Sequence, residues 1–280
     1  MIELRNLSKK YDHFLAVDNL NLTIETGEFF GLLGPNGAGK TTTIGMLSTL
    51  LLPTEGEVLI DSEKLNRQNN QLKRKLSVVT QEYSMRQDMN MDEIMEYQGR
   101  LYFMPRKQIK ERTEELLEFC DLLKFRKRTV RKLSGGMKRK LMVCRALLTD
   151  PEILLLDEPT AGMDALSRRQ MWNLLRKLNE KNLTILLTTH YMEEAQSLCN
   201  RVALMDHGKL EEVSTPSALI ESLGAYAVDE MTADGTQNHY FHTRQEAIRY
   251  LEELTGQASL RETTLEDVFV ERAGKHLISK

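Results

Sequence analysis

The sequence GPNGAGKT, from Gly34 to Thr41, is the strongest indication of how this 280-residue chain folds. It fits the phosphate-binding pattern GxxxxGK[ST] and lies between an apolar segment, EFFGLLG, and a helix-like segment, KTTTIGMLSTLLL, which we expect Pro53 to end. Glycines let backbone N–H groups wrap around phosphate oxygens, and the start of a helix adds partial positive charge. We predict that Lys40 reaches the terminal phosphates of a nucleoside triphosphate and that the Thr41 hydroxyl binds Mg²⁺.

A second chemical signal is the segment ILLLDEPT, in which four aliphatic residues precede two carboxylates. The pattern predicts a buried strand with Asp157 and Glu158 at its carboxyl end, the edge at which doubly wound sheets bind ligands. We expect Asp157 to hold Mg²⁺, directly or through water, and Glu158 to orient and deprotonate an attacking water. The alternative is that Glu158 is only a surface acid beside a metal-binding Asp157.

The order of segments along the chain predicts an α/β protein. The stretch from Ile2 to Glu28 favours short strands broken by polar turns, and a helical, more polar region runs from about Asp92 to Leu123, divided by Pro105. Strand and helix patterns then alternate, which indicates a mostly parallel sheet. Beyond Pro216 we expect a helix, a hairpin of AYAVDEM and NHYFHT across the turn ADGTQ, a helix from Gln245 to Leu254, a strand and a last helix.

Composition and charge exclude several classes of protein. The net charge of -3 and the pI near 6.1 give no reason to expect a nucleic-acid partner, since phosphate neutralisation needs clustered cations. The three cysteines form no CxxC pair, which favours a reduced, cytoplasmic setting without a structural metal. The N-terminus lacks the apolar core of a signal peptide and no apolar run is long enough to span a bilayer, so any membrane role is expected to be peripheral.

The segment LSGGM, from Leu133 to Met137, resembles the signature LSGGQ of the ATP-binding subunits of ABC transporters. Met137 departs from the signature, whereas Ser134, Gly135 and Gly136 are retained. These three residues are expected at a helix start, where a hydroxyl and free N–H groups hold a γ-phosphate. In isolation the same residues would indicate only a serine N-cap followed by two glycines.

Other positions follow in the order that the resemblance implies. Tyr11 matches the aromatic residue that stacks on adenine, Gln81 the glutamine that senses Mg²⁺ and the attacking water, and Asp164 the loop that crosses the dimer interface. His190 matches the switch histidine that touches the γ-phosphate. The plainer alternatives are a tyrosine at a strand end for Tyr11 and a structural histidine for His190.

Three sets of site residues result from these motifs and from the resemblance. The expected nucleotide-binding residues are Tyr11, Gly34, Pro35, Asn36, Gly37, Ala38, Gly39, Lys40, Thr41, Thr42, Ser134, Gly135, Gly136 and Asp164. The expected catalytic residues are Lys40, Gln81, Glu158 and His190. The expected Mg²⁺ ligands are Thr41, Gln81 and Asp157.

The resemblance covers residues 1 to about 215 and implies a P-loop NTPase of the ABC ATPase type. Such a domain has a mostly parallel sheet core, an antiparallel β subdomain and a helical subdomain, expected at roughly 84–150. Residues 216–280 are expected to form a small α+β accessory domain. LSGGMKRKL, TTHYMEEA and TLEDVFVERAG are similar to the exporter subgroup that includes drug-resistance, lipid, polysaccharide and sodium-efflux ATPases.

The implied function is to bind and hydrolyse ATP, with Mg²⁺, and to power an ABC transporter, expected to be an exporter, through closure of an ATPase dimer. The implied partners are integral membrane subunits and a second ATPase subunit, identical or different, at the cytoplasmic face of the cell membrane. The alternative is an ABC-type ATPase with a non-transport role, such as regulation or macromolecule remodelling. DNA-repair heads are disfavoured because no long coiled coil separates the two motifs, and translation ATPases because they carry two such domains. A metabolite kinase would leave LSGGM unexplained.

Two further segments have open interpretations. Methionine suits a surface that accepts another protein's helix, so we predict that Met85, Met89 or Met91 contacts a membrane subunit, whereas Met95 and Met104 pack internally. The basic segment LKFRKRTVRKL is either a solvated loop, the reading we favour, or a contact for anionic lipid headgroups or acidic loops.

Overall fold

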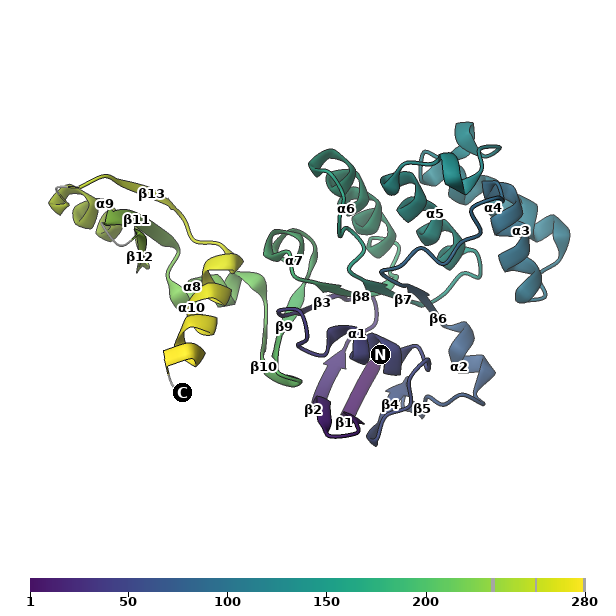
Figure 1. Ribbon diagram of the computed structural model, residues 1–280, viewed down its shortest axis with the longest axis horizontal. Helices are drawn as coiled ribbons and strands as arrows, with labels where there is room; N and C mark the ends of the chain where they lie inside the picture. Colours follow the sequence, from purple (N-terminus) through teal and green to yellow (C-terminus); the bar gives the residue numbers. More distant parts are fainter. Residues whose placement is uncertain (233–234, 255, 279–280) are drawn as a thin grey trace. The chain divides into compact units, whose positions relative to one another are not determined.

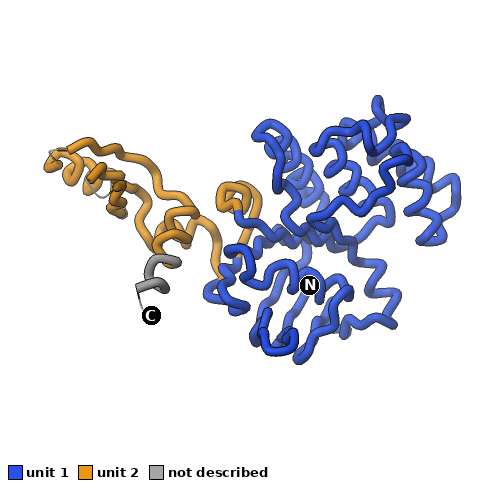
Figure 2. The backbone as a smooth tube through the Cα atoms, viewed as in Figure 1, with its two compact units in different colours: residues 1–190, 203–212 blue, residues 191–202, 213–280 orange. Residues whose placement is uncertain are grey.

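The computed structural model describes residues 1–232, 235–254 and 256–278, and it divides the chain into two compact units (Figure 2). The first unit contains residues 1–190 and 203–212, and the second contains residues 191–202 and 213–280. The expected boundary between a domain of residues 1–215 and an accessory domain of residues 216–280 stays a prediction.

A four-stranded antiparallel sheet contains the N-terminus of the first unit (Figure 1). Its strands, in the order β2-β1-β4-β5, are β2 (Phe14–Ile24), β1 (Ile2–Tyr11), β4 (Glu55–Ile60) and β5 (Glu63–Lys64). The expectation of short, interrupted strands is wrong, because β1 and β2 are long. Register shifts in their pairing, and positive φ angles at Asn6 and Asn19, let the strands continue through polar residues as bulges rather than ending in turns.

A six-stranded sheet forms the core of the fold, in the order β10-β9-β3-β8-β7-β6. Neighbours β3 and β8, β8 and β7, and β7 and β6 are parallel. Every residue of β3, β7 and β8 is buried, as expected for parallel strands covered on both faces, and the predicted parallel core is confirmed. The strands are β3 (Phe29–Leu33), β6 (Leu76–Val79), β7 (Ile153–Asp157), β8 (Thr184–Thr189), β9 (Arg201–Asp206) and β10 (Lys209–Ser214).

Helix α1 (Lys40–Leu47) follows β3 through the glycine-rich loop. It ends well before Pro53, so the expectation that this proline stops the helix is wrong. The chain leaves the helical conformation at Thr49, whose φ is 61°, and the N–H of Leu51 turns back to the carbonyl of Gly45. A short helix, α2 (Asn70–Arg74), is capped by Asn69, whose side chain accepts the N–H of Leu72.

Three helices pack on one another and form a helical region, α3 (Met91–Leu101), α4 (Arg106–Phe119) and α5 (Gly135–Leu147). Of these, α3 and α4 lie in the stretch from about Asp92 to Leu123 that was expected to be helical. Asn90 and Glu93 make a capping box that fixes the start of α3. Pro105 immediately precedes α4 and separates it from α3, as predicted. Two 3₁₀ turns, η1 (Leu123–Phe125) and η2 (Val130–Lys132), lead into α5, and α6 (Ala165–Asn179) follows β7.

The second unit contains a three-stranded antiparallel sheet in the order β12-β11-β13. Strands β11 (Tyr226–Thr232) and β12 (Gly235–Phe241) make the predicted hairpin, although part of its turn lies outside the described residues. Helix α9 packs on this sheet, while α10 packs against α7 and α8. The remaining elements are α7 (Met192–Leu198), α8 (Pro216–Leu223), α9 (Arg244–Glu253), β13 (Ala258–Glu262) and α10 (Leu265–Ile278).

Candidate functional site

The glycine-rich loop between β3 and α1 is packed too closely for side chains at two of its positions. A Cβ atom on Gly34 would lie 2.1 Å from the carbonyl oxygen of Met205. Gly39 has a φ of 104°, and its Cβ would lie 2.4 Å from the carbonyl oxygen of Ala16. Only glycine fits at these places, which keeps the backbone of the loop free to approach a ligand.

Lys40 lies at the start of α1 and is only 5% exposed. Its Nζ donates to the carbonyl oxygens of Gly34, at 2.8 Å, and Pro35, at 2.9 Å, and lies 4.0 Å from Oε1 of Glu158. Burial lowers the pKa of Lys40, while the charges of Glu158 and Asp157 act in the opposite direction. The ammonium group is therefore held inside the loop, next to the acidic end of β7.

Asp157, the last residue of β7, is fixed by two hydroxyl groups. Its Oδ1 accepts hydrogen bonds from Oγ1 of Thr41, at 3.2 Å, and from Oγ1 of Thr188, at 2.6 Å. The sequence predicted that Thr41 and Asp157 lie close together, because both were expected to bind the same Mg²⁺, but it gave no signal for Thr188. The parallel register of β7 and β8, which places Asp157 opposite Thr188, brings the second hydroxyl to the carboxylate.

Glu158 lies at the centre of the expected catalytic residues. Its φ is 46°, a conformation that turns the chain sharply as it leaves β7. Oε1 lies 3.2 Å from Nδ1 of His190, and Oε2 accepts a hydrogen bond from Nε2 of Gln81 at 3.4 Å. Lys40, Gln81, Glu158 and His190 thus meet at the carboxyl ends of neighbouring strands.

The oxygen atoms beside this centre suit Mg²⁺. Thr41 and Asp157 provide a hydroxyl and a carboxylate 3.2 Å apart, both of which are hard oxygen ligands. Within the described residues, no group of three or more His, Cys, Asp or Glu side chains forms a metal cage. Mg²⁺ is usually bound by one or two protein oxygens together with phosphates and water, and Thr41 and Asp157 provide two such oxygens.

The signature segment begins α5, as predicted. Ser134 is the N-cap of the helix, and its Oγ accepts the N–H of Met137 at 3.2 Å. A Cβ atom on Gly136 would lie 3.1 Å from Oγ of Ser167, whose own hydroxyl donates to Oδ2 of Asp164 at 2.7 Å. Ser167, which the sequence did not indicate, is therefore bonded to Asp164 and lies beside Gly136 of the signature.

Within one chain the signature and the phosphate loop are not bonded to each other. Among the described residues, no hydrogen bond or ion pair joins residues 134–136 to residues 34–42. Tyr11 ends β1 and is 41% exposed, and Nζ of Lys9 lies 5.1 Å from the centre of its ring.

Three of the five methionines between Gln81 and Pro105 are buried, although most of the residues from Glu82 to Asp88 are exposed. Met85 is 7% exposed and Met91 is fully buried, so the prediction that either contacts a membrane subunit is wrong. Both side chains fill the helical region instead of facing outwards. Met89 is half-buried, so a contact of Met89 with a membrane subunit stays a prediction. Met95 is buried, as predicted, whereas Met104 is only half-buried.

The basic segment makes its own contacts. Arg126 and Lys127 both pair with Asp92, at 2.8 and 2.9 Å. Lys124 and Arg128 both lie over the ring of Phe125. Four of the cations of LKFRKRTVRKL are therefore engaged within the helical region.

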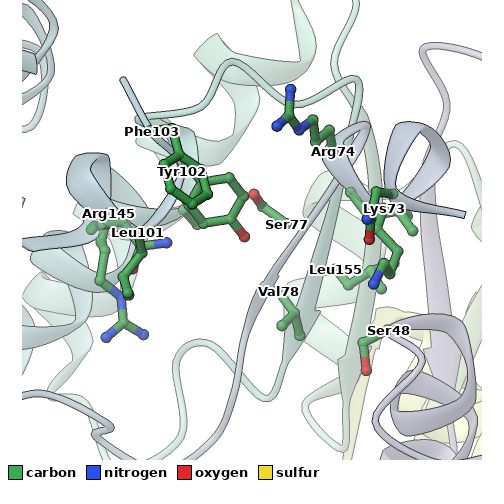
Figure 3. Close-up of a pocket in the computed structure, with 14 residues that line it drawn as sticks. Ser48, Lys73, Arg74, Ser77, Val78, Leu101, Tyr102, Phe103, Arg145 and Leu155 are labelled. Carbon is green, nitrogen blue, oxygen red and sulfur yellow. The ribbon is translucent and has the colours of Figure 1, made fainter. Parts of the chain in front are cut away.

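An exposed apolar patch lies at the end of α3, beside a cleft. Phe103 is 89% exposed, and Leu101 and Tyr102 are also exposed. The cleft has a volume of about 520 Å³, and Figure 3 shows these three residues on one side of it, facing Ser77 and Val78 across the opening. Nothing in the sequence indicated this cleft, because its walls come from segments far apart in the chain.

The fold and the geometry around Glu158 define an ATP-hydrolysing protein of the P-loop class. Comparison with known proteins identifies the family: residues 17–161 match the ABC transporter family, and the chain belongs to it. The chain is 37% identical to Nod factor export ATP-binding protein I of Cupriavidus metallidurans, covering 99% of this chain and 98% of the relative. It is 34% identical to linearmycin resistance ATP-binding protein LnrL of Bacillus subtilis, covering 84% and 76%.

Solved structures agree with this assignment. A dimeric ATP-binding cassette in a post-hydrolysis state, bound to ADP and Pi, is 30% identical, with a TM-score of 0.69 over 77% of this chain and 98% of that chain. An ATP-binding subunit of an ABC transporter, 22% identical, shares the fold with a TM-score of 0.73 over 97% and 98%.

The chain is therefore the ATP-binding and ATP-hydrolysing subunit of an exporter-type ABC transporter. Subunits of this kind dimerise and work with membrane transporter subunits. In the part of the chain that the structure describes, no helix has both the length and the apolar character needed to cross a membrane.

Proposed function

We propose that Glu158 is the general base of ATP hydrolysis. The observation that supports this role is the position of its carboxylate, which contacts Gln81 and His190 and lies 4.0 Å from the ammonium of Lys40. A base must lie within hydrogen-bond reach of its water, and Gln81 and His190 provide two polar groups that orient the water and the γ-phosphate beside it. Lys40 and the N–H groups of its loop bind the phosphates.

The Mg²⁺ site of this proposal is formed by Thr41, Asp157 and Gln81. When bound there, Mg²⁺ supplies neutralisation of the charge on the phosphate oxygens. The carboxylate of Asp157 keeps its orientation through the hydroxyl of Thr188, which donates to it at 2.6 Å. The exposed ring of Tyr11 stacks on the adenine.

Two copies of the chain build each complete site. Ser134, Gly135 and Gly136 bind the γ-phosphate of the ATP held by the partner's loop, and Asp164 lies at the dimer interface. The separation of the two motifs within one chain supports this arrangement, as does the dimeric state of the similar cassette bound to ADP and Pi. We propose a homodimer, because one chain carries both halves of the site.

The transporter is an exporter located in the cell membrane, with this chain at its cytoplasmic face. The names of the two relatives, one for export and one for resistance, support the outward direction. Within the chain, residues 1–215 form the ATPase domain, with a helical subdomain at about 84–150, and residues 216–280 form an accessory domain.

The cleft at the end of α3 is the surface that receives the membrane subunit. Its apolar wall of Leu101, Tyr102 and Phe103 is exposed, and such surfaces are typical of protein contacts. Cysteine at Phe103 is expected to crosslink to a membrane subunit in the intact transporter, whereas cysteine at the exposed Lys177 on α6 is not. Absence of a crosslink from Phe103 in an intact complex would disprove this placement.

The test of the catalytic proposal is Glu158→Gln, which removes the base and preserves the size of the side chain. We expect kcat to fall about 10²- to 10⁴-fold while ATP binding is retained. Glu180→Gln, at the exposed end of α6, makes the same chemical change away from the site and should leave turnover unchanged. Turnover of Glu158→Gln within a factor of two of the parent would exclude Glu158 as the base.

A further inference from the structure

Arg139, in the second turn of α5, is a buried cation without an anionic partner. It is 2% exposed, and in the described part of the chain no carboxylate lies within ion-pair distance of it and no acceptor faces its Nε. Burial lowers the pKa of Arg139, with the charges of Tyr83 and Asp157 acting in the opposite direction. Burying a charge in this way is costly, and an apolar side chain of similar volume would serve stability as well or better.

Apart from a 4.0 Å contact between Nη1 and Sδ of Met142 on the same helix, the contacts of Arg139 go to the segment that follows β6. Nη1 donates to the carbonyl oxygen of Thr80 at 2.7 Å, and Nη2 donates to the carbonyl oxygen of Gln81 at 3.0 Å. The guanidinium also lies 5.2 Å from the centre of the Tyr83 ring. The hydroxyl of Tyr83 in turn donates to the carbonyl oxygen of Gly135, within the signature, at 3.4 Å.

These contacts lie where the sheet no longer fixes the backbone. Strand β6 ends at Val79, and its ladder with β7 ends at the same residue. Thr80 and Gln81 continue beyond the ladder, and the two donors of Arg139 occupy both of their carbonyl oxygens. Planar guanidinium groups suit this task because the two N–H groups have a fixed spacing.

The position of the Gln81 backbone determines where its side chain ends. Nε2 of Gln81 reaches Oε2 of Glu158 at 3.4 Å, a distance at the outer limit of a hydrogen bond. A small displacement of Thr80 and Gln81 would therefore separate the amide from the carboxylate. Reaction rates are sensitive to displacements of this size, even when the displaced group takes no part in bond making.

We propose that Arg139 is a positioning residue for ATP hydrolysis, which holds Gln81 beside Glu158 from the signature helix through its two hydrogen bonds to backbone carbonyls. Helix α5 also carries the signature at its start, where Ser134 is the N-cap. Arg139 therefore links the helix that carries the signature to the backbone of Gln81. This inference rests on the roles proposed above for Gln81 and Glu158.

The experiment is a double-mutant cycle of Arg139→Met and Gln81→Ala in the full chain, assembled with its transporter. Arg139→Met should lower kcat about 10- to 100-fold and change the KM for ATP less than about threefold, because the phosphate loop is untouched. In the Gln81→Ala background, Arg139→Met should cause no further loss of kcat. Arg139→Lys, which keeps the charge and donates to at least one carbonyl, should recover part of the activity.

The control is Arg126→Met, which removes an arginine bonded to Asp92 in the same helical region. It should lower stability, measured by urea unfolding, without changing kcat. If Arg139→Met does not fold, Arg139→Lys replaces it in the cycle, with a smaller loss that Gln81→Ala again abolishes.

Three outcomes separate the possibilities. If Gln81→Ala has a reduced kcat but the Arg139 variant has a normal kcat, the inference about Arg139 is overturned and the proposed function is left intact. Losses that multiply in the double variant also overturn it, because Arg139 then acts independently of Gln81. Normal kcat in Gln81→Ala overturns the proposed role of Gln81 and this inference together.

Discussion

Replacing Thr188 by valine tests whether the hydrogen bond from Thr188 holds Asp157 in place as a Mg²⁺ ligand. The parallel register of β7 and β8 brings these two residues together. Thr188 is fully buried, and its Oγ1 donates to Asp157 at 2.6 Å and accepts the N–H of Glu158 at 3.1 Å. Valine has the same shape without the hydroxyl. The N–H of Glu158 keeps a second acceptor, the carbonyl oxygen of Thr188 at 3.1 Å, so the main loss is the bond to the carboxylate.

The size of the effect follows from that bond. A hydrogen bond to a charged group contributes about 1.5 to 3 kcal/mol, so we expect the free energy of unfolding to fall by roughly 2 kcal/mol. Groups that orient a metal ligand typically contribute about 10- to 100-fold to metal affinity. Thr188→Val should therefore require about 10- to 100-fold more Mg²⁺ for half-maximal ATP hydrolysis, while kcat at saturating Mg²⁺ changes much less.

The assay combines two titrations. Urea unfolding is followed by the fluorescence of Trp172, the one tryptophan of the chain, which is buried on α6 in the first unit. Mg²⁺ is titrated against ATP hydrolysis and, separately, against thermal stabilisation in the presence of ADP. The matched control is Thr184→Val, on the same strand, where the buried hydroxyl accepts the N–H of Gly27 at 2.9 Å.

The control should lose about 1 kcal/mol, as for a neutral hydrogen bond, and keep the Mg²⁺ dependence of the parent. Two results would refute the claim that the bond from Thr188 to Asp157 orients a Mg²⁺ ligand. Thr188→Val could keep the half-saturating Mg²⁺ concentration of the parent, or both variants could shift that concentration equally.

Two further predictions concern the second unit and the dimer. Hydrogen bonds from Arg261 and Thr264 lower the pKa of Asp267 despite the opposing effect of its burial, so the carboxylate stabilises this unit above about pH 4 and loses that effect as pH falls below it. Asp267→Asn should therefore be about 2 to 3 kcal/mol less stable than the parent at pH 7, as measured by hydrogen exchange of β13. The difference in stability between variant and parent should disappear in acid, and a difference that does not change with pH would contradict this. In the dimer, Lys40→Ala and Ser134→Arg should each be nearly inactive alone, whereas mixing them gives about half mixed dimers with one intact site, so ATP hydrolysis should partly return. Confirmed mixed dimers as inactive as either parent would contradict independent, shared sites.

The sequence by itself predicted those features that contiguous residues determine. A glycine-rich loop followed by Lys40 and Thr41 needs only the local order of residues to make an anion site at a helix start. Asp157 and Glu158 follow four aliphatic residues, so their place at the end of a buried strand is equally local. The helix start at the signature was predicted for the same reason, whereas the parallel core was predicted from the alternation of strand and helix segments.

Local patterns failed where packing over longer separations competes with them. Helix α1 ends at Leu47 because the chain turns back on Gly45, not because Pro53 stops it. Met85 and Met91 are buried by the packing of the helical region, and methionine composition does not distinguish a flexible surface from a core.

Only the tertiary structure determined how the site is held together. Thr188 reaches Asp157 because β7 and β8 are paired in one particular parallel register, and Arg139 reaches Gln81 across 58 positions of the chain because α5 packs beside the end of β6. Neither contact has a signature in sequence, because a threonine in a strand or an arginine in a helix has many acceptable surroundings. Residue order specifies which groups are present, whereas strand register and helix packing specify which of them meet.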